Sequence, residues 1–268
     1  MDDFSYQKPK SLGDAGAAFA DAEDGTFLAG GQTILPVMKL GLAAPSAMID
    51  LSGIEELQSI SATDAAVSIG AMVTHAAVAV SADVTGAIPA LSSLAGIIGD
   101  PQVRTRGTLG GSIANNDPAA DYPAAVLALG ATIITDNRQI AADGFFTDMF
   151  ETALEDGEII TSVEFPVPDA AGYAKFANPA SRFALAGVFV ARIGDTVRVA
   201  VTGAGTCVFR VPEMEAALQQ NFSAAALDGI TVASDDLNTD MHASAEYRAH
   251  LIGVMARRAV DAANGENQ

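Results

Sequence analysis

The chain has 268 residues, half of them hydrophobic and 18% charged, which predicts an ordered globular protein of one large or two ordinary domains. Its 14 basic and 33 acidic residues give a net charge of -19, which opposes binding to nucleic acid or to anionic membrane surfaces. The single cysteine, Cys207, excludes an internal disulfide and a cysteine-ligated metal or iron–sulfur site built from this chain alone. Three scattered histidines do not read as metal ligands. A phosphate site in so acidic a chain must therefore be local and built from backbone amides.

The first ten residues, M-D-D-F-S-Y-Q-K-P-K, contain no apolar signal region. No apolar run approaches the roughly 18 residues that a membrane span needs. We therefore expect a cytoplasmic protein without membrane insertion.

The first predicted elements alternate between helix and strand. A helix at 11–24 is closed by Gly25, and a strand at 26–29 follows it. A helix at 33–40 tolerates Pro36 only in its first turn, and a strand at 47–51 comes next. This order predicts a small α/β unit.

The middle of the chain mixes strands, helices and one polar stretch that we expect to be a loop, 105–123. In chain order the other elements are a strand at 67–72, helices at 76–81, 89–98 and 123–129, and strands at 131–135 and 159–165. The run P-V-P-D at 166–169 stops the last strand and is the best domain boundary in the chain.

After this boundary the pattern predicts an α+β domain. Three strands at 173–178, 183–192 and 197–202 form a meander, and helices at 212–219 and 244–263 close the chain.

Two glycine-rich segments stand out as candidate binding loops. The first glycine segment is L-A-G-G-Q-T-I-L-P at 28–36, and the second is G-T-L-G-G-S at 107–112, within the predicted loop. Glycines let backbone approach a ligand closely, and the Thr108 and Ser112 hydroxyls can bind phosphate oxygens. Amides and acids follow at Asn115, Asn116, Asp117 and Asp121, and an acid there can accept hydrogen bonds from ribose or ribityl hydroxyls. Two such cradles suit a pyrophosphate, although Asp121 could instead cap a helix and Asp117-Pro118 could simply form a turn.

A third glycine pattern, T-G-A-G-T-C at 202–207, invites comparison with a dinucleotide-binding fingerprint. The third glycine of that fingerprint would fall at Val208, and no helix is predicted there. A strand that ends in a tight turn is the favoured interpretation.

Three motifs, A-G-G-Q-T-I-L-P at 29–36, the long run at 99–123 and K-F-A-N-P-A-S-R-F-A at 175–184, resemble the FAD-binding medium subunit of molybdenum hydroxylases. The likeness is to the aerobic carbon monoxide dehydrogenase type, within the wider xanthine oxidase family. It implies an α+β fold: a two-subdomain FAD-binding domain of the vanillyl-alcohol oxidase-like type over residues 1–170, then a smaller α+β domain over 171–268. The subdomains would cover about 1–55 and 56–170.

The resemblance also implies which residues contact FAD. They are Ala29, Gly30, Gly31, Gln32, Thr33, Ile34, Thr108, Leu109, Gly110, Gly111, Ser112, Asp121, Ile160, Lys175 and Phe183. Phe183 stands where carbon monoxide dehydrogenases carry a tyrosine against the isoalloxazine ring, so this chain keeps the ring and loses the hydroxyl. A cation at Lys175 would stabilise an anionic reduced flavin, although Lys175 could instead be a solvated strand lysine.

The implied function is electron transfer through FAD. Substrate would be oxidised at a molybdenum cofactor on a large subunit, and electrons would cross two-iron two-sulfur clusters on a small subunit to this chain, which passes them to an external acceptor. We expect a dimer of heterotrimers, no metal and no catalytic residue on this chain, and an undefined substrate and acceptor. Two alternatives stay open: a cofactor-free docking or assembly subunit, and a stand-alone nicotinamide dehydrogenase.

Overall fold

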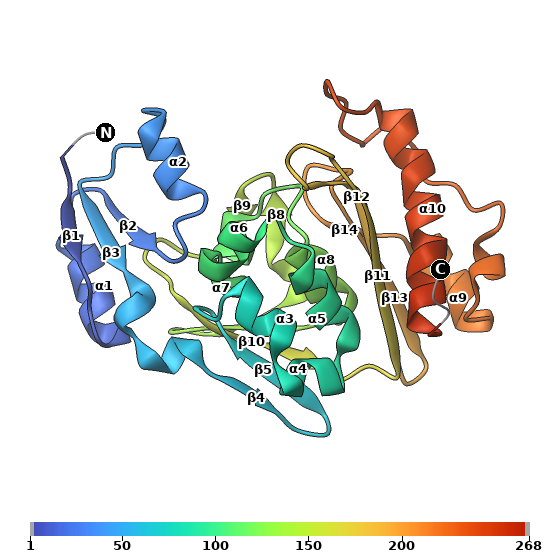
Figure 1. Ribbon diagram of the computed structural model, residues 1–268, viewed down its shortest axis with the longest axis horizontal. Helices are drawn as coiled ribbons and strands as arrows, with labels where there is room; N and C mark the ends of the chain where they lie inside the picture. The colour runs from blue at the N-terminus through green and yellow to red at the C-terminus, as the bar shows by residue number, and fades with distance from the viewer. Residues whose placement is uncertain (1–2, 266–268) are drawn as a thin grey trace.

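The computed structural model describes residues 3–265, in which three larger sheets follow one another along the long axis of the molecule (Figure 1). The N-terminal sheet lies at one end, the central sheet and its helices in the middle, and the C-terminal sheet at the other end. Within the described residues no helix is both long and apolar enough to cross a bilayer.

The N-terminal sheet is parallel, with strand order β1-β3-β2. Parallel neighbours need crossover connections, and helices supply them here. The elements are β1 (Ser5–Gln7), α1 (Leu12–Ala20), β2 (Gly25–Leu28), α2 (Ile34–Lys39) and β3 (Ala47–Asp50). The Ser11 hydroxyl caps α1 by accepting from the Asp14 N–H, and α2 places Pro36 in its first turn, as predicted.

The central sheet is antiparallel, with strand order β4-β5-β10-β6-β7. Its strands are β4 (Ile60–Ala62), β5 (Ala66–Gly70), β6 (Thr132–Thr135), β7 (Gln139–Ala141) and β10 (Ile160–Pro166). Six helices accompany it: α3 (His75–Val80), α4 (Ala82–Ala87), α5 (Pro89–Gly96), α6 (Pro101–Arg106), α7 (Leu109–Asn115) and α8 (Tyr122–Ala128). A small hairpin follows, made of β8 (Phe146–Asp148) and β9 (Glu151–Thr152). Short 3-10 turns occupy Leu51–Gly53, Glu55–Gln58, Ala142–Gly144 and Ala224–Leu227.

The expectation of one loop over 105–123 is wrong, because the second glycine segment forms most of a helix. Thr108 caps α7 by accepting from the Gly111 N–H at 3.1 Å, and burial of Leu109 and Ile113 offsets the poor helix propensity of the glycines. Asn116, with φ of 42°, ends the helix. Within 105–123, only residues 107–108 and 116–121 lie outside helices.

The C-terminal sheet is antiparallel and follows chain order, β11 (Ala170–Ala177), β12 (Ala184–Ile193), β13 (Thr196–Thr202) and β14 (Phe209–Arg210). The predicted three-stranded meander thus has a fourth strand, which at two residues is too short to show a sequence pattern. Helices α9 (Pro212–Gln220) and α10 (Ala245–Ala263) cover one face, while α5 and α8 of the central unit contact strands of the same sheet (Figure 1).

The predicted fold class, an α+β protein with a larger first part and a smaller C-terminal part, is confirmed. The three sheets fall within residues 5–50, 60–166 and 170–210. The domain limits at 55 and 170 stay predictions.

Candidate functional site

A cleft of about 640 Å³ lies where the three units meet. Four parts of the chain supply most of its lining: the first glycine segment, the region from Ile98 to Asp121, the start of β10, and the loop before β12. Residues next to these parts, including Ala71, Met72 and His75, complete it. Small-molecule sites commonly occupy about 300–1,000 Å³. The cleft is therefore large enough for a sizeable organic ligand.

The structure brings all but two of the fifteen predicted contact residues to this cleft. Those that line it are Ala29, Gly30, Gly31, Gln32, Thr33, Ile34, Thr108, Gly110, Gly111, Ser112, Asp121, Ile160 and Phe183. Leu109 does not line the cleft because its side chain is fully buried in the central core. Lys175 does not line it either, because its side chain lies behind Asp121 and is only 4% exposed.

The two glycine segments touch each other. A Cβ atom built on Gly30 would lie 2.2 Å from the carbonyl oxygen of Arg106, and one built on Gly111 would lie 3.2 Å from the Cβ of Ala29. Since no real Cβ comes so close to a backbone oxygen, only glycine fits at position 30. Two segments nearly 80 residues apart in sequence thus form one continuous wall of the cleft.

Most backbone N–H groups of the second glycine segment, including all four in residues 109–112, already donate to protein oxygens. Leu109 donates to Val73 O at 3.0 Å and Gly110 donates to Ala71 O at 2.9 Å. The next two N–H groups donate to Thr108, from Gly111 to its hydroxyl and from Ser112 to its carbonyl. The amides of residues 109–112 therefore cap α7 and anchor it to the end of the central sheet, and contact between this segment and a phosphate stays a prediction.

The first glycine segment differs in this respect. Between residues 3 and 265, none of the hydrogen bonds within the protein is donated by the backbone N–H groups of residues 30–34. Gly31 has φ of 71°, and this left-handed conformation places consecutive N–H groups in a concave turn just before the N-terminus of α2. A local, uncharged anion site is thus available despite the strongly acidic chain.

Asp121 sits at the wall of the cleft and is 4% exposed. Its carboxylate accepts from the Tyr173 hydroxyl at 2.5 Å and pairs with the Lys175 ammonium at 2.9 Å. Lys175 also donates to the carbonyls of Ile97 and Arg182. Burial raises the pKa of Asp121, and the Lys175 charge and the Tyr173 hydrogen bond oppose that rise. Asp121 occupies the N-cap position of α8, as the alternative interpretation expected, but its side chain makes no capping hydrogen bond. The solvated interpretation of Lys175 is wrong, because the side chain is buried against Asp121.

Asp117 adopts the turn that Asp117-Pro118 suggested, with its carboxylate accepting from the Ala119 N–H at 2.9 Å. Burial raises the pKa of Asp117.

Phe183 lines the cleft from the C-terminal side with its side chain about half exposed. The residue before it, Arg182, has φ of 64°, and its guanidinium donates to Gly99 O at 3.2 Å. This contact ties the loop before β12 to the loop before α6. An aromatic ring is thereby presented to the cavity.

A family model described as the FAD binding domain in molybdopterin dehydrogenase matches residues 2–168, and one described as the CO dehydrogenase flavoprotein C-terminal domain matches residues 173–263. The chain belongs to this flavoprotein family. It is an FAD-binding medium subunit of the molybdenum hydroxylase type and part of an oxidoreductase.

Relatives and solved structures agree with this membership. The chain is 37% identical to the nicotine 6-hydroxylase medium subunit of Paenarthrobacter nicotinovorans, over 95% of each chain. It is 34% identical to the carbon monoxide dehydrogenase medium chain of Hydrogenophaga pseudoflava, over 97% of this chain and 96% of the other. A structure of carbon monoxide dehydrogenase from that organism matches with a TM-score of 0.88 and 34% identity, covering 100% of this chain and 99% of the other.

Several residues that line the flavoprotein's cleft were not among the predicted contacts, and His75 is the one with the most perturbed environment. His75, at the start of α3, is 5% exposed, and its backbone N–H donates to Gly107 O at 2.9 Å. Its Nδ1 is buried without a partner. Burial and, secondarily, the Arg104 charge lower the pKa of His75 to about 4. The sequence did contain a signal for His75, because it follows a predicted strand and a Thr that can cap a helix. Residues just after strands commonly line binding sites.

The glycine pattern of 202–207 lines neither the cleft nor the second cavity of the flavoprotein. Gly203 has φ of 83°, and its N–H donates to Pro118 O at 2.8 Å. The strand followed by a tight turn is confirmed, and no helix follows it.

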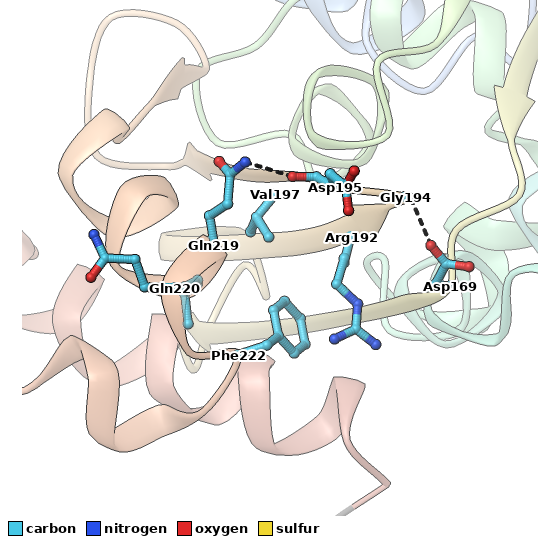
Figure 2. Close-up of a pocket in the computed structure, with 9 residues that line it drawn as sticks. Asp169, Arg192, Gly194, Asp195, Val197, Gln219, Gln220 and Phe222 are labelled. Carbon is cyan, nitrogen blue, oxygen red and sulfur yellow. Dashed lines mark hydrogen bonds between the residues drawn. The ribbon is translucent and has the colours of Figure 1, made fainter.

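The flavoprotein also has a second cavity, of about 730 Å³, in its C-terminal part (Figure 2). It lies between the β12–β13 turn and the end of α9, and it shares no residue with the first cleft. Its polar groups mostly serve the fold: Asp169 accepts from the Gly194 N–H, Gln219 donates to Asp195 O, and Arg192 stacks over Phe222 (Figure 2). We assign it no ligand.

Proposed function

We propose that the cleft binds FAD and that this chain passes electrons from a partner's iron–sulfur clusters to an external acceptor. One observation carries the proposal: the unpaired backbone N–H groups of residues 30–34 line the same cleft as the Phe183 ring and Asp121. An anion site, an aromatic face and a hydrogen-bond acceptor for sugar hydroxyls match the three chemical parts of a flavin dinucleotide. FAD, when bound, supplies a carrier that accepts and releases electrons.

Each part of the chain has a separate task in this proposal. The first glycine segment binds the diphosphate through N–H groups, because a chain with 14 basic and 33 acidic residues has few cations to supply a basic patch. The second glycine segment supplies a close-packed floor and the hydroxyl of Ser112. Phe183 packs against the isoalloxazine ring. No residue of this chain is required to act as an acid, base or nucleophile.

We further propose that the chain works with a large molybdenum-cofactor subunit and a small two-iron two-sulfur subunit, as a dimer of heterotrimers in the cytoplasm. Relatives named as medium subunits or medium chains support this, as does the single cysteine of this chain, which cannot hold a cluster. The relatives' names refer to different substrates, nicotine in one and carbon monoxide in others. We therefore place substrate choice on the large subunit.

Identification of the bound ligand tests the proposal. The complex is purified, denatured, and the released small molecules are identified by chromatography and mass spectrometry. We expect one FAD per copy of this chain. Recovery of a nicotinamide nucleotide would favour the stand-alone dehydrogenase, and recovery of no cofactor from intact complex would favour a docking subunit.

A further inference from the structure

We propose that Tyr173 is a positioning residue through which the C-terminal sheet fixes Asp121 and adjusts the bound flavin. The inference rests on the proposed function, because it concerns the cleft assigned to FAD. Tyr173 does not line that cleft, and no sequence motif drew attention to it. Its importance comes from what the hydroxyl touches.

Tyr173 and Lys175 are two residues apart on β11 and so point to the same face of the sheet. The Tyr173 hydroxyl donates to Asp121 Oδ1 at 2.5 Å, and Lys175 Nζ lies 2.9 Å from the same oxygen and 3.1 Å from Oδ2. The lysine and aspartate side chains are each 4% exposed. One strand of the C-terminal sheet therefore supplies both a charge and a neutral donor to one buried carboxylate.

The neighbouring strand is shaped to admit this hydroxyl. Gly187 of β12 pairs with Lys175 and with Thr202 of β13. A Cβ at position 187 would lie 2.5 Å from the Tyr173 hydroxyl oxygen and 3.0 Å from Cγ2 of Thr202. Only glycine leaves the room that both side chains need.

Thr202 and Gly203 continue the contact along the cleft wall. The Thr202 hydroxyl lies 2.6 Å from Ala120 O and 3.1 Å from Pro118 O, and the Gly203 N–H donates to Pro118 O at 2.8 Å. The loop that carries Asp117, Ala120 and Asp121 into the cleft is thus held by the C-terminal sheet at several points.

The contacts from Tyr173 and Lys175 control whether Asp121 is charged. A charge beside a buried redox group acts through a low dielectric, so its loss changes the relative stability of oxidised and reduced flavin. The titratable groups that act on this carboxylate are Lys175 and Tyr173 from β11, and Tyr122 of α8 carries a hydroxyl whose own pKa is raised by burial and by Asp121. Removal of the Tyr173 donor favours the neutral acid, which favours reduced, anionic flavin.

The test is the midpoint potential of the flavin as a function of pH in the holoenzyme carrying Tyr173→Phe. The protonation of Asp121 should appear as a change of slope. We expect the slope of the variant to change at a higher pH than that of the wild type. At pH values between these two slope changes, the midpoint potential of the variant should be more positive. Tyr247→Phe, on the exposed side of α10, is the matched control and should superimpose on the wild type.

A double-mutant comparison separates this role from a general loss of structure. In an Asp121→Asn background the potential should already be more positive, and adding Tyr173→Phe should shift it no further. An equal shift in both backgrounds, or a Tyr173→Phe profile identical to wild type, would overturn the inference while leaving FAD binding intact. A wild-type complex without FAD would instead overturn the proposed function. Should Tyr173→Phe fail to fold, Lys175→Met, which removes the other donor, must show the same upward move of the slope change.

Discussion

The first and second glycine segments start from a similar plan, an apolar lead-in followed by Gly-Gly, yet their backbone N–H groups have different partners. In residues 30–34 these groups have no acceptor among residues 3–265, whereas in residues 109–112 every one of them donates to a protein oxygen. The second segment begins a helix that hydrogen-bonds to the end of the central sheet at Ala71 and Val73. The first follows β2 and lines the cleft with residues 29–34.

This difference assigns different tasks to similar sequences. An N–H group can bind a ligand only if the fold leaves it unpaired, because a paired group would have to break a bond worth about 1 kcal/mol. We therefore expect the first segment to make the backbone contacts with the ligand and the second to support it.

Gly30→Ala should have the largest effect. The added Cβ would meet the Arg106 carbonyl at 2.2 Å and push the segments apart, which we expect to weaken FAD binding more than about 100-fold and to cost about 1–3 kcal/mol of stability. Equilibrium titration with FAD and denaturant unfolding measure the two effects. Gly86→Ala, in α4 with nothing within 4 Å, is the control. Unchanged affinity in Gly30→Ala would remove the first segment from the binding site.

Acid should act on the second segment through His75. Its pKa is lowered from 6.5 to about 4, so the unfolded chain takes up the proton first. The stabilisation is fully present above pH 6.5 and is lost as pH falls from there towards 4, by about 3 kcal/mol in total. Unfolding free energies measured across this range should flatten in His75→Gln relative to wild type. The same slope in both proteins would contradict the assignment.

Thr108→Ala tests the cap of α7. We expect a loss of about 1 kcal/mol of unfolding free energy, because Gly111 loses its acceptor, with a smaller effect on FAD affinity. Thr74→Ala, the corresponding cap of α3, should cost a similar amount. A large loss of FAD affinity without loss of stability would mean that the second segment contacts the ligand directly.

Gln32→Ala should have the smallest effect. This exposed side chain only approaches Gly30 O at 3.5 Å, while the proposed contact is made by its backbone N–H. Affinity for FAD should change by less than about threefold in the same titration, since removing an exposed side chain typically costs within about 0.5 kcal/mol. A tenfold loss would show that the side chain takes part.

Much of the fold and of the cleft's composition was predictable from local patterns. The strands around Ile49, Ile69 and Val190 have apolar sequences that fit buried strands, and the resemblance gathered residues as distant as Ala29 and Phe183 into one predicted site. The helix over 109–115 was not predictable, because its two glycines favour a loop until Leu109 and Ile113 find a core to fill. The cluster of Tyr173, Lys175 and Asp121 was not either, since its members meet across more than fifty residues.

The sequence by itself determined that glycine must stand at the close approaches and that an acidic chain would bind phosphate through its backbone. Tertiary structure decided which glycine segment keeps its N–H groups free, and which side chains hold Asp121. The physical reason is that hydrogen-bond satisfaction and burial depend on what lies opposite each group, and that partner comes from another part of the chain.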